Sequence, residues 1–525
     1  MSSVREAFYD VARELGMTHI FSNPGSTEVP LLVDFPQDFE FVLGLHEGSV
    51  VGMATGWALG CEVPALVLLH TTAGFGNAAG AIATARVNKA PMVVLVGQQD
   101  RRHLHSEPFL AGHLDGLAGV YPVWVGHPAR AADVPSLVRR GYHEAVLHRG
   151  PAIVIVPMDD WSAPMPRGRL SSPIAVRRSV ATNQDDRQAV ADLLACADRP
   201  VLICGAGADD AATWRALVEI AEKADALVWQ EPFGARAGFP QDHERFMGHL
   251  PSGRSGVRES LAGHDLVVVV GAASLRQYGY EEGELFGERA RVVVITDDEA
   301  EAAHSTADLA VVAPLSPFCR GLAAVLPEPA SRNRPAVSRR VAARPHGDRL
   351  MPVDVFRELA ARLPAVSTVV EESPSSRSDL MDLLPARAPL GFLSAAMGGL
   401  GFALPASIGL KMAQPDRPVV AIVGDGSSLY SIQALWSAQR YDVGVLIIVL
   451  TNGGYGIMDR LAAQAGGEPP WPGFPDLNLS ELSAAWGCPS RRLATREDMV
   501  ASLAEIVPGL ATSKRPVLLD IEVGR

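Results

Sequence analysis

The chain has 525 residues, of which 48% are hydrophobic and 20% are charged. That apolar content can repay the entropy of ordering the chain, so a mainly disordered protein is excluded, and the length suggests about three domains. The 46 basic and 59 acidic residues give a net charge of −13 without a dense basic block. We therefore expect neither a nucleic-acid nor a membrane partner.

Five cysteines are spread along the chain without a CxxC pair. An odd number of scattered cysteines is typical of buried thiols in a reducing compartment, so we expect a cytoplasmic protein. The longest apolar runs, such as residues 443–450, have the length of a strand and are too short to cross a bilayer.

The first segment, residues 1–170, alternates short apolar runs with helical stretches. Apolar runs without polar alternation are typical of parallel strands that are covered on both faces of the sheet. The predicted strands are 19–21, 41–45, 64–69 and 91–96, and the predicted helices include 48–59 and 76–87.

Two stretches, 163–185 and 328–348, lose this periodicity and gather proline, arginine and serine, which is typical of linkers. The strands predicted between and after them are 200–204, 226–229, 265–270, 291–295, 368–371, 419–423, 445–450 and 516–521. The predicted fold is therefore α/β, with three consecutive doubly wound domains at 1–170, 185–328 and 348–525.

The most informative stretch is residues 419–456. One buried strand ends in Gly-Asp-Gly around Asp425, and the next ends in Asn-Gly-Gly, beginning at Asn452. Neighbouring parallel strands would bring these side chains to the carboxyl edge of the sheet, where α/β proteins bind ligands. A carboxylate, an amide oxygen and a main-chain carbonyl suit Mg²⁺. Each motif alone is more commonly a simple turn, so their combination carries the prediction.

Asn452 follows Asp425 by 27 positions, and in this spacing the chain resembles the thiamine-diphosphate-dependent enzymes. Three further stretches resemble benzoylformate decarboxylases: FSNPGSTEVPLL at 21–32, LLHTTAGFGNAAGA at 68–81 and SAAMGGLGFALPASIG at 394–409. The resemblance implies thiamine diphosphate and Mg²⁺ as cofactors. It also implies three domains: a first that binds the pyrimidine, a central one, and a last that binds the diphosphate.

The resemblance implies catalytic roles for four side chains. Glu47 would share a proton with the aminopyrimidine ring, although a glutamate in a first helical turn is usually there for the helix dipole. Ser26 would contact the substrate carboxylate, or would simply cap a helix that starts near Glu28. His70 would transfer protons, or would only end a strand. Tyr278 stands where the family has a second histidine, and tyrosine is a poorer proton shuttle at neutral pH.

The resemblance also implies which residues hold the cofactors. Leu400, in a Gly-Gly-Leu-Gly turn, would support the bent shape of the cofactor, or would be an ordinary core residue. Mg²⁺ would bind Asp425, Asn452 and the main-chain carbonyl of Gly454. The expected contacts with thiamine diphosphate are Glu47, Leu400, Gly398, Gly426, Ser427, Ser373, Ser375 and Tyr455.

The chain departs from the family at the substrate pocket. Two phenylalanines that line the phenyl pocket of the family align with Ser394 and Leu461, so we expect a less aromatic pocket. Three histidines could approach the site from a loop, although histidines in surface loops are commonly without such a role: His103, His105 and His113.

The resemblance predicts a lyase that decarboxylates a small 2-oxo acid to an aldehyde and CO₂ without oxidation. It implies a homodimer as the minimum active unit and a homotetramer as the usual assembly. One alternative is a carboligase like acetolactate synthase, which would use the same cofactor. Another is a flavin- or nucleotide-binding oxidoreductase using the glycine turns at 205–210 and 269–274, and a third is a catalytically silent homologue.

Overall fold

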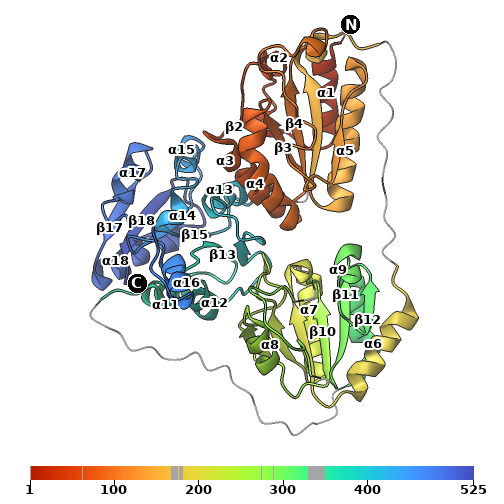
Figure 1. Cartoon of the computed structure of the whole chain (residues 1–525), viewed down its shortest axis with the longest axis vertical. Coiled ribbons are helices and arrows are strands. Elements are labelled where there is room, and N and C mark those ends of the chain that lie inside the picture. The colour runs from red at the N-terminus through yellow and green to blue at the C-terminus, as the bar shows by residue number, and fades with distance from the viewer. Residues whose placement is uncertain are drawn as a thin grey trace. The chain divides into compact units, whose positions relative to one another are not determined.

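The computed structural model describes residues 2–61, 63–166, 176, 181–273, 275–287, 289–328 and 349–524. The two predicted linkers, 163–185 and 328–348, lie largely outside the described residues. The described chain contains three six-stranded α/β sheets with parallel strands and accompanying helices (Figure 1).

The first sheet has the strand order β2-β1-β3-β4-β6-β5. Its strands are β1 (His19–Asn23), β2 (Glu40–Leu43), β3 (Ala65–Leu69), β4 (Met92–Gln98), β5 (Trp124–Gly126) and β6 (Pro151–Pro157). Its helices are α1 (Val4–Glu14), α2 (Val29–Leu32), α3 (Glu47–Gly60), α4 (Ala73–Val87) and α5 (Val134–His148). The central strands β3, β4 and β6 are buried along their whole length, as their apolar runs require.

The second sheet has the order β12-β11-β10-β7-β8-β9. Its strands are β7 (Pro200–Cys204), β8 (Leu227–Gln230), β9 (Phe246–His249), β10 (Leu266–Val270), β11 (Arg291–Thr296) and β12 (Leu309–Val312). Its helices are α6 (Gln184–Cys196), α7 (Ala211–Lys223), α8 (Arg254–Ser260), α9 (Glu299–Ala303) and α10 (Leu315–Val325).

The third sheet has the order β14-β13-β15-β16-β18-β17. Its strands are β13 (Thr368–Glu372), β14 (Phe392–Ser394), β15 (Val419–Gly424), β16 (Leu446–Thr451), β17 (Ser490–Leu493) and β18 (Val517–Glu522). Its helices are α11 (Pro352–Arg362), α12 (Arg377–Leu383), α13 (Ala403–Ala413), α14 (Asp425–Ser428), α15 (Ala434–Arg440), α16 (Gly456–Gln464), α17 (Leu479–Ala485) and α18 (Arg496–Ile506).

The predicted α/β fold is confirmed, and each predicted strand overlaps an observed one. Six observed strands were not predicted. Five of them, β5, β9, β12, β14 and β17, lie at the edges of their sheets, and all but β14 carry partly exposed residues that interrupt an apolar run. The sixth, β6, is continuously apolar and buried, like the strands that were predicted. The sequence therefore carried the signal for this strand, and the prediction overlooked it.

By their contacts, the residues group into two compact units. The first combines 1–176, 370–375 and 395–525, and the second combines 177–369 and 376–394. The predicted domain boundaries stay a prediction, although each of the three ranges contains one sheet. No helix among the described residues has both the length and the apolar character needed to cross a membrane.

Within the first unit, helices α3 and α13 cross with their backbones in contact. A Cβ atom placed on Gly56 would lie 1.9 Å from the carbonyl oxygen of Ala406, and one on Gly409 would lie 1.8 Å from that of Met53. Only glycine permits so close an approach. The helix that begins at Glu47 is therefore packed directly against the helix that follows the Gly398–Gly401 turn.

Candidate active site

Glu47 is the first residue of α3, as the sequence predicted, and its side chain is buried. The side-chain amide of Asn23 donates to Oε1 of Glu47 at 3.1 Å, and that of Asn77 donates to Oε2 at 3.0 Å. Both amides act as donors because an ionised carboxylate only accepts hydrogen bonds. The end of β1 and the second turn of α4 thus hold one oxygen of the carboxylate each.

His70 directly follows β3, and its ring is bound to a second buried carboxylate. Its Nδ1 lies 3.0 Å from Oε2 of Glu28 and 3.0 Å from Oγ1 of Thr27. The side chain of Glu28 is fully buried and also accepts the N–H of Gly25 at 2.7 Å. When Nδ1 donates to Glu28, the proton-exchanging position of the ring is Nε2.

Ser26 lies in the turn between β1 and α2 and is exposed. The alternative that it caps a helix is wrong, because α2 begins at Val29, its N-cap residue is Glu28, and no side chain caps it. The tight turn leaves no room beside it: a Cβ on Gly25 would lie 2.3 Å from Nδ1 of His70. Gly25, the residue before Ser26, therefore packs against the Glu28–His70 pair.

Asp425 and Asn452 meet at the carboxyl edge of the third sheet, as their strand-end positions predicted. They follow the neighbouring parallel strands β15 and β16. Oδ2 of Asp425 accepts the N–H groups of Asn452 at 2.9 Å and of Gly453 at 2.7 Å, and Oδ1 accepts that of Gly426 at 2.8 Å. Oδ1 of Asn452 accepts the N–H of Gly454 at 3.1 Å.

This edge fits a hard divalent cation. Asp425 is 3% exposed, and burial raises the pKa of its carboxyl group. A cation beside it would favour the charged form. Among the described residues, no group of three or more His, Cys, Asp or Glu side chains could hold a metal ion. A site here would instead combine one carboxylate with amide and main-chain oxygens, which are donors that Mg²⁺ accepts.

The other residues predicted to contact the diphosphate lie in the same unit. Gly426 and Ser427 are buried on α14, and Tyr455 stands directly before α16 with its ring 5.1 Å from that of Phe474. A Cβ on Gly426 would lie 2.5 Å from the ring of Tyr455, so any larger residue there would displace this ring.

Ser373 and Ser375 follow β13. The N–H of Ser373 donates to Glu371 at 2.6 Å, and Arg460 donates to the carbonyl of Ser375 at 2.8 Å. Leu400 is 38% exposed, which contradicts the alternative that it is an ordinary core residue.

The structure locates the residues predicted to line the substrate pocket, but it does not test whether they form one pocket. Tyr278 belongs to the second unit and is 63% exposed, so its approach to the other residues stays a prediction. Ser394 is buried and its hydroxyl accepts from Arg377 at 3.3 Å, whereas Leu461 lies half-buried on α16. The less aromatic pocket also stays a prediction.

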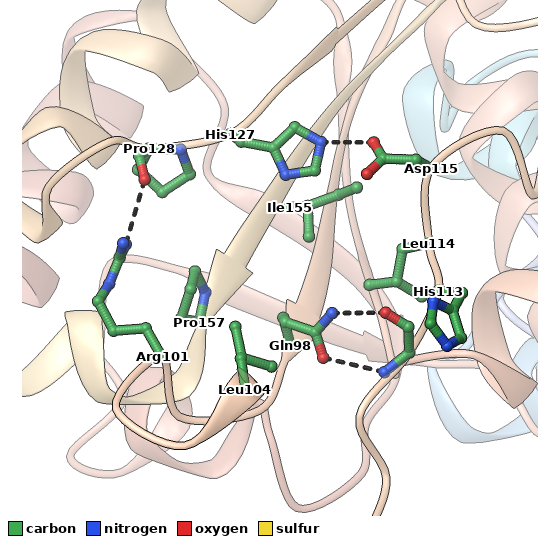
Figure 2. Close-up of a pocket in the computed structure, with 11 residues that line it drawn as sticks. Gln98, Arg101, Leu104, His113, Leu114, Asp115, His127, Pro128, Ile155 and Pro157 are labelled. Carbon is green, nitrogen blue, oxygen red and sulfur yellow. Dashed lines mark hydrogen bonds and ion pairs between the residues drawn. The ribbon is translucent and has the colours of Figure 1, made fainter. Parts of the chain in front are cut away.

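A cavity of about 440 Å³ opens at the carboxyl ends of β4 and β6 (Figure 2). Gln98 fixes its wall, because its amide donates to the carbonyl of Gly112 at 2.7 Å and accepts the N–H of Gly112 at 3.1 Å. His127 pairs with Asp115 at 2.7 Å on the opposite side. Of the three loop histidines, His113 lines this cavity.

The glycine turns of the second sheet pack against each other. A Cβ on Gly207 would lie 2.9 Å from the carbonyl oxygen of Gly271, and one on Gly205 would lie 2.8 Å from the same atom. A turn that binds phosphate must instead offer its backbone N–H groups to a ligand. This packing favours a structural role for these glycines over the nucleotide-binding alternative.

Sequence reasoning missed the residues that bind the predicted ones. Asn23, Asn77, Thr27 and Glu28 hold Glu47 and His70, yet none of them was chosen as a site residue. The polar residue that ends the apolar strand β1 was a signal for Asn23. Asn77 lies within a helix, and the sequence carries no comparable signal for it.

Three models of the thiamine pyrophosphate enzymes match the chain. The N-terminal TPP binding domain matches residues 2–118, the central domain 187–322, and the C-terminal TPP binding domain 375–521.

The chain is 37% identical to a benzoylformate decarboxylase of Pseudomonas aeruginosa, with 99% of each chain covered. It is 28% identical to a putative acetolactate synthase large subunit of Mycobacterium tuberculosis, with 97% of this chain and 96% of the other covered.

Among solved structures, it is similar to a thiamine diphosphate-dependent 4-hydroxybenzoylformate decarboxylase of Rhodococcus jostii RHA1, with a TM-score of 0.93, 34% identity and 100% and 99% of the two chains covered. A benzoylformate decarboxylase from Polynucleobacter necessarius has the same TM-score and coverage at 30% identity.

Proposed function

The chain belongs to the thiamine pyrophosphate enzymes, and from this premise we propose that it decarboxylates a 2-oxo acid to an aldehyde and CO₂ with thiamine diphosphate and Mg²⁺. The observation that carries the proposal is the meeting of Asp425 and Asn452 at the carboxyl edge of the third sheet. The similarity to benzoylformate decarboxylases over nearly the whole chain supports decarboxylation as the reaction.

Mg²⁺ would bind Asp425, Asn452 and the carbonyl oxygen of Gly454, and would supply positive charge for the anionic cofactor. The buried carboxylate and the oxygen donors beside it support this assignment. Thiamine diphosphate, when bound, supplies the electron sink that makes loss of CO₂ possible.

The expected diphosphate contacts, Gly426, Ser427, Ser373, Ser375 and Tyr455, belong to the same unit as the metal-binding residues. Gly398 and Leu400 would contact the rest of the cofactor from the turn before α13.

The chain's own residues would position the reactants and move protons. Glu47 would hold a proton at one carboxylate oxygen, toward the pyrimidine ring, while Asn23 and Asn77 keep the carboxylate in place. Ser26 would orient the substrate carboxylate. His70 would exchange a proton through Nε2, with Glu28 keeping the opposite nitrogen as the donor. Tyr278 would assist from the second unit.

The assembly is proposed from the family. Glu47 of one subunit would serve the cofactor held by the third sheet of another, so a homodimer is the minimum active unit and a homotetramer the expected assembly. We place the enzyme in the cytoplasm, on the evidence of its five unpaired cysteines. Its domains are proposed at 1–170, 185–328 and 348–525.

The substrate differs, in this proposal, from that of the decarboxylases named above. Ser394 and Leu461 replace aromatic residues of the pocket, so the bound 2-oxo acid should be less dependent on a phenyl ring. A panel of 2-oxo acids with phenyl, indolyl, branched and linear side chains, scored by CO₂ release, tests this. Turnover restricted to benzoylformate would contradict the altered pocket.

Both a decarboxylase and a carboligase, the second candidate, release CO₂, so the organic products of the same incubations are analysed to separate them. The more distant acetolactate synthase relative is the observation behind this candidate. Aldehyde as the main product supports the proposal, and a 2-hydroxyketone as the main product contradicts it. Chelation of Mg²⁺ should abolish activity, and added Mg²⁺ with thiamine diphosphate should restore it. Activity that persists after complete chelation would contradict the cofactor assignment.

A further inference from the structure

Glu372 is a buried carboxylate at the end of β13 whose partners are three consecutive backbone N–H groups. Its Oε1 accepts the N–H of Gly401 at 2.7 Å, and its Oε2 accepts those of Phe402 and Ala403, each at 2.7 Å. These groups lie 29 to 31 residues further along the chain, where the Gly398–Gly401 turn leads into α13. The carboxylate therefore joins the sheet to the start of this helix.

Burying an ionised carboxylate at the start of α13 is energetically unfavourable. Glu372 is 6% exposed, and burial raises the pKa of its carboxyl group to about 7 against the opposing effect of the three N–H groups. A serine, threonine, asparagine or aspartate in the N-cap position would satisfy the free N–H groups locally. Here the N-cap residue is Phe402, and its side chain makes no capping hydrogen bond. Glu372 performs this task from a different element.

The turn that Glu372 holds needs an external anchor. Gly398 has φ +70° and Gly401 has φ +85°, which is the left-handed region that favours glycine. Two flexible residues thus flank Leu400, whose side chain is partly exposed. The hydrogen bond from Gly401 to Glu372 fixes the peptide directly after Leu400, so the sheet determines where that side chain stands.

We propose that Glu372 is a positioning residue of the cofactor site, which fixes the Gly398–Gly401 turn so that Leu400 meets thiamine diphosphate in the correct place. This inference rests on the proposed function, because it requires Leu400 to contact the cofactor. It differs from a purely stabilising role, in which Glu372 would strengthen the fold without affecting how the cofactor binds.

A matched control is available in the same chain. Asp354 is 2% exposed, and its Oδ2 accepts the N–H of Met351 at 3.0 Å at the start of α11. It is also a buried carboxylate that binds a free backbone N–H at a helix start, but it holds no part of the Gly398–Gly401 turn. Asp354→Asn should therefore lower stability without changing cofactor affinity.

The test compares four variants by direct titration of Mg²⁺-saturated, cofactor-free enzyme with thiamine diphosphate, and by melting temperature without cofactor. Glu372→Gln keeps the shape but turns an amide NH₂ toward backbone donors, and should raise the Kd about tenfold. Asp354→Asn should leave the Kd unchanged. Leu400→Ala should also raise the Kd, and the Glu372→Gln/Leu400→Ala double variant should bind no more weakly than Leu400→Ala alone.

Two results would overturn the inference: an unchanged Kd in Glu372→Gln, or losses in the double variant that add. Either would mean that Glu372 does not act through Leu400. If Glu372→Gln does not fold, Glu372→Asp, which keeps the charge on a shorter side chain, is titrated in its place with the same criteria. Failure of the unmodified enzyme to bind thiamine diphosphate would instead contradict the proposed function, so the two failures are distinguishable.

Discussion

Four buried carboxylates near the candidate site, two on the first sheet and two on the third, are held in different ways. On the first sheet, Glu47 is bound by the side-chain amides of Asn23 and Asn77, and Glu28 is bound by the side chains of Thr27 and His70 together with one backbone N–H. On the third sheet, Asp425 and Glu372 are each held by three backbone N–H groups.

The difference corresponds to different tasks. Backbone donors follow from the path of the chain, and only a substitution by proline removes one, so they suit a rigid support for a metal ion or a turn. Side-chain donors can be adjusted one at a time, and they suit groups that must exchange protons. The comparison supports the proposed proton-transfer roles of Glu47 and His70 on the first sheet, and the anchoring roles of Asp425 and Glu372 on the third.

The largest expected effect is that of Glu47→Gln, which removes the proton-holding carboxylate and keeps its shape. CO₂ release at saturating cofactor should fall by about 100-fold or more. The affinity for thiamine diphosphate should change much less, because the proposed diphosphate contacts belong to the third sheet. A measurable rate that stays unchanged would mean that Glu47 has no part in catalysis. The absence of CO₂ release from both the unmodified enzyme and the variant would favour the catalytically silent homologue.

Asp425→Asn tests the carboxylates that are held by backbone N–H groups, and it should lower both stability and metal binding. The new amide NH₂ faces the backbone donors of Asn452 or Gly453, so the variant should lose about 1–3 kcal/mol of unfolding free energy. Its activity should need at least about tenfold more Mg²⁺ than the unmodified enzyme. Titration of activity with Mg²⁺ and urea unfolding measure the two effects. A normal Mg²⁺ requirement would mean that Asp425 is not a ligand.

Glu28→Gln should affect catalysis more than the fold, because it changes the partner of His70 from a carboxylate to an amide. The kcat should fall on the order of tenfold and KM should change little. Thr27→Val removes the neutral partner of the same ring together with its hydrogen bond to Glu28, but leaves the carboxylate in place. It is the matched control and should have a smaller effect. Equal effects of both variants would show that the charge of Glu28 has no special part.

Asn77→Ala should have the smallest effect. It leaves Oε2 of Glu47 without its amide donor, while Asn23 still holds Oε1. The kcat should fall several-fold, which corresponds to the loss of about 1 kcal/mol for one hydrogen bond. The melting temperature should stay close to that of the unmodified enzyme, in contrast to Asp425→Asn. A large loss of stability would contradict the distinction between side-chain donors, which affect catalysis, and backbone donors, which support the fold.

The same distinction explains how much of the site was predictable. Asp425 and Asn452 were found together because each ends an apolar strand, and neighbouring parallel strands end at one edge. Glu47 was found because the family resemblance implies a catalytic glutamate at the start of a helix, and Glu47 follows a strand and opens one. The side-chain partners Asn77 and Glu28 were missed, since their roles depend on three or more elements meeting at one point.

The sequence by itself determined the α/β class, all central strands except β6 and the location of the proposed metal-binding edge, because burial on both faces imposes continuous apolar runs. It did not determine the edge strands such as β5 and β17, whose partly exposed residues carry a weaker pattern. Only the tertiary structure showed that Ser26 caps no helix and that Glu372 holds a turn 29 residues away. Local patterns are set by solvent exposure along one element, whereas the partner of a buried carboxylate is set by how distant elements pack.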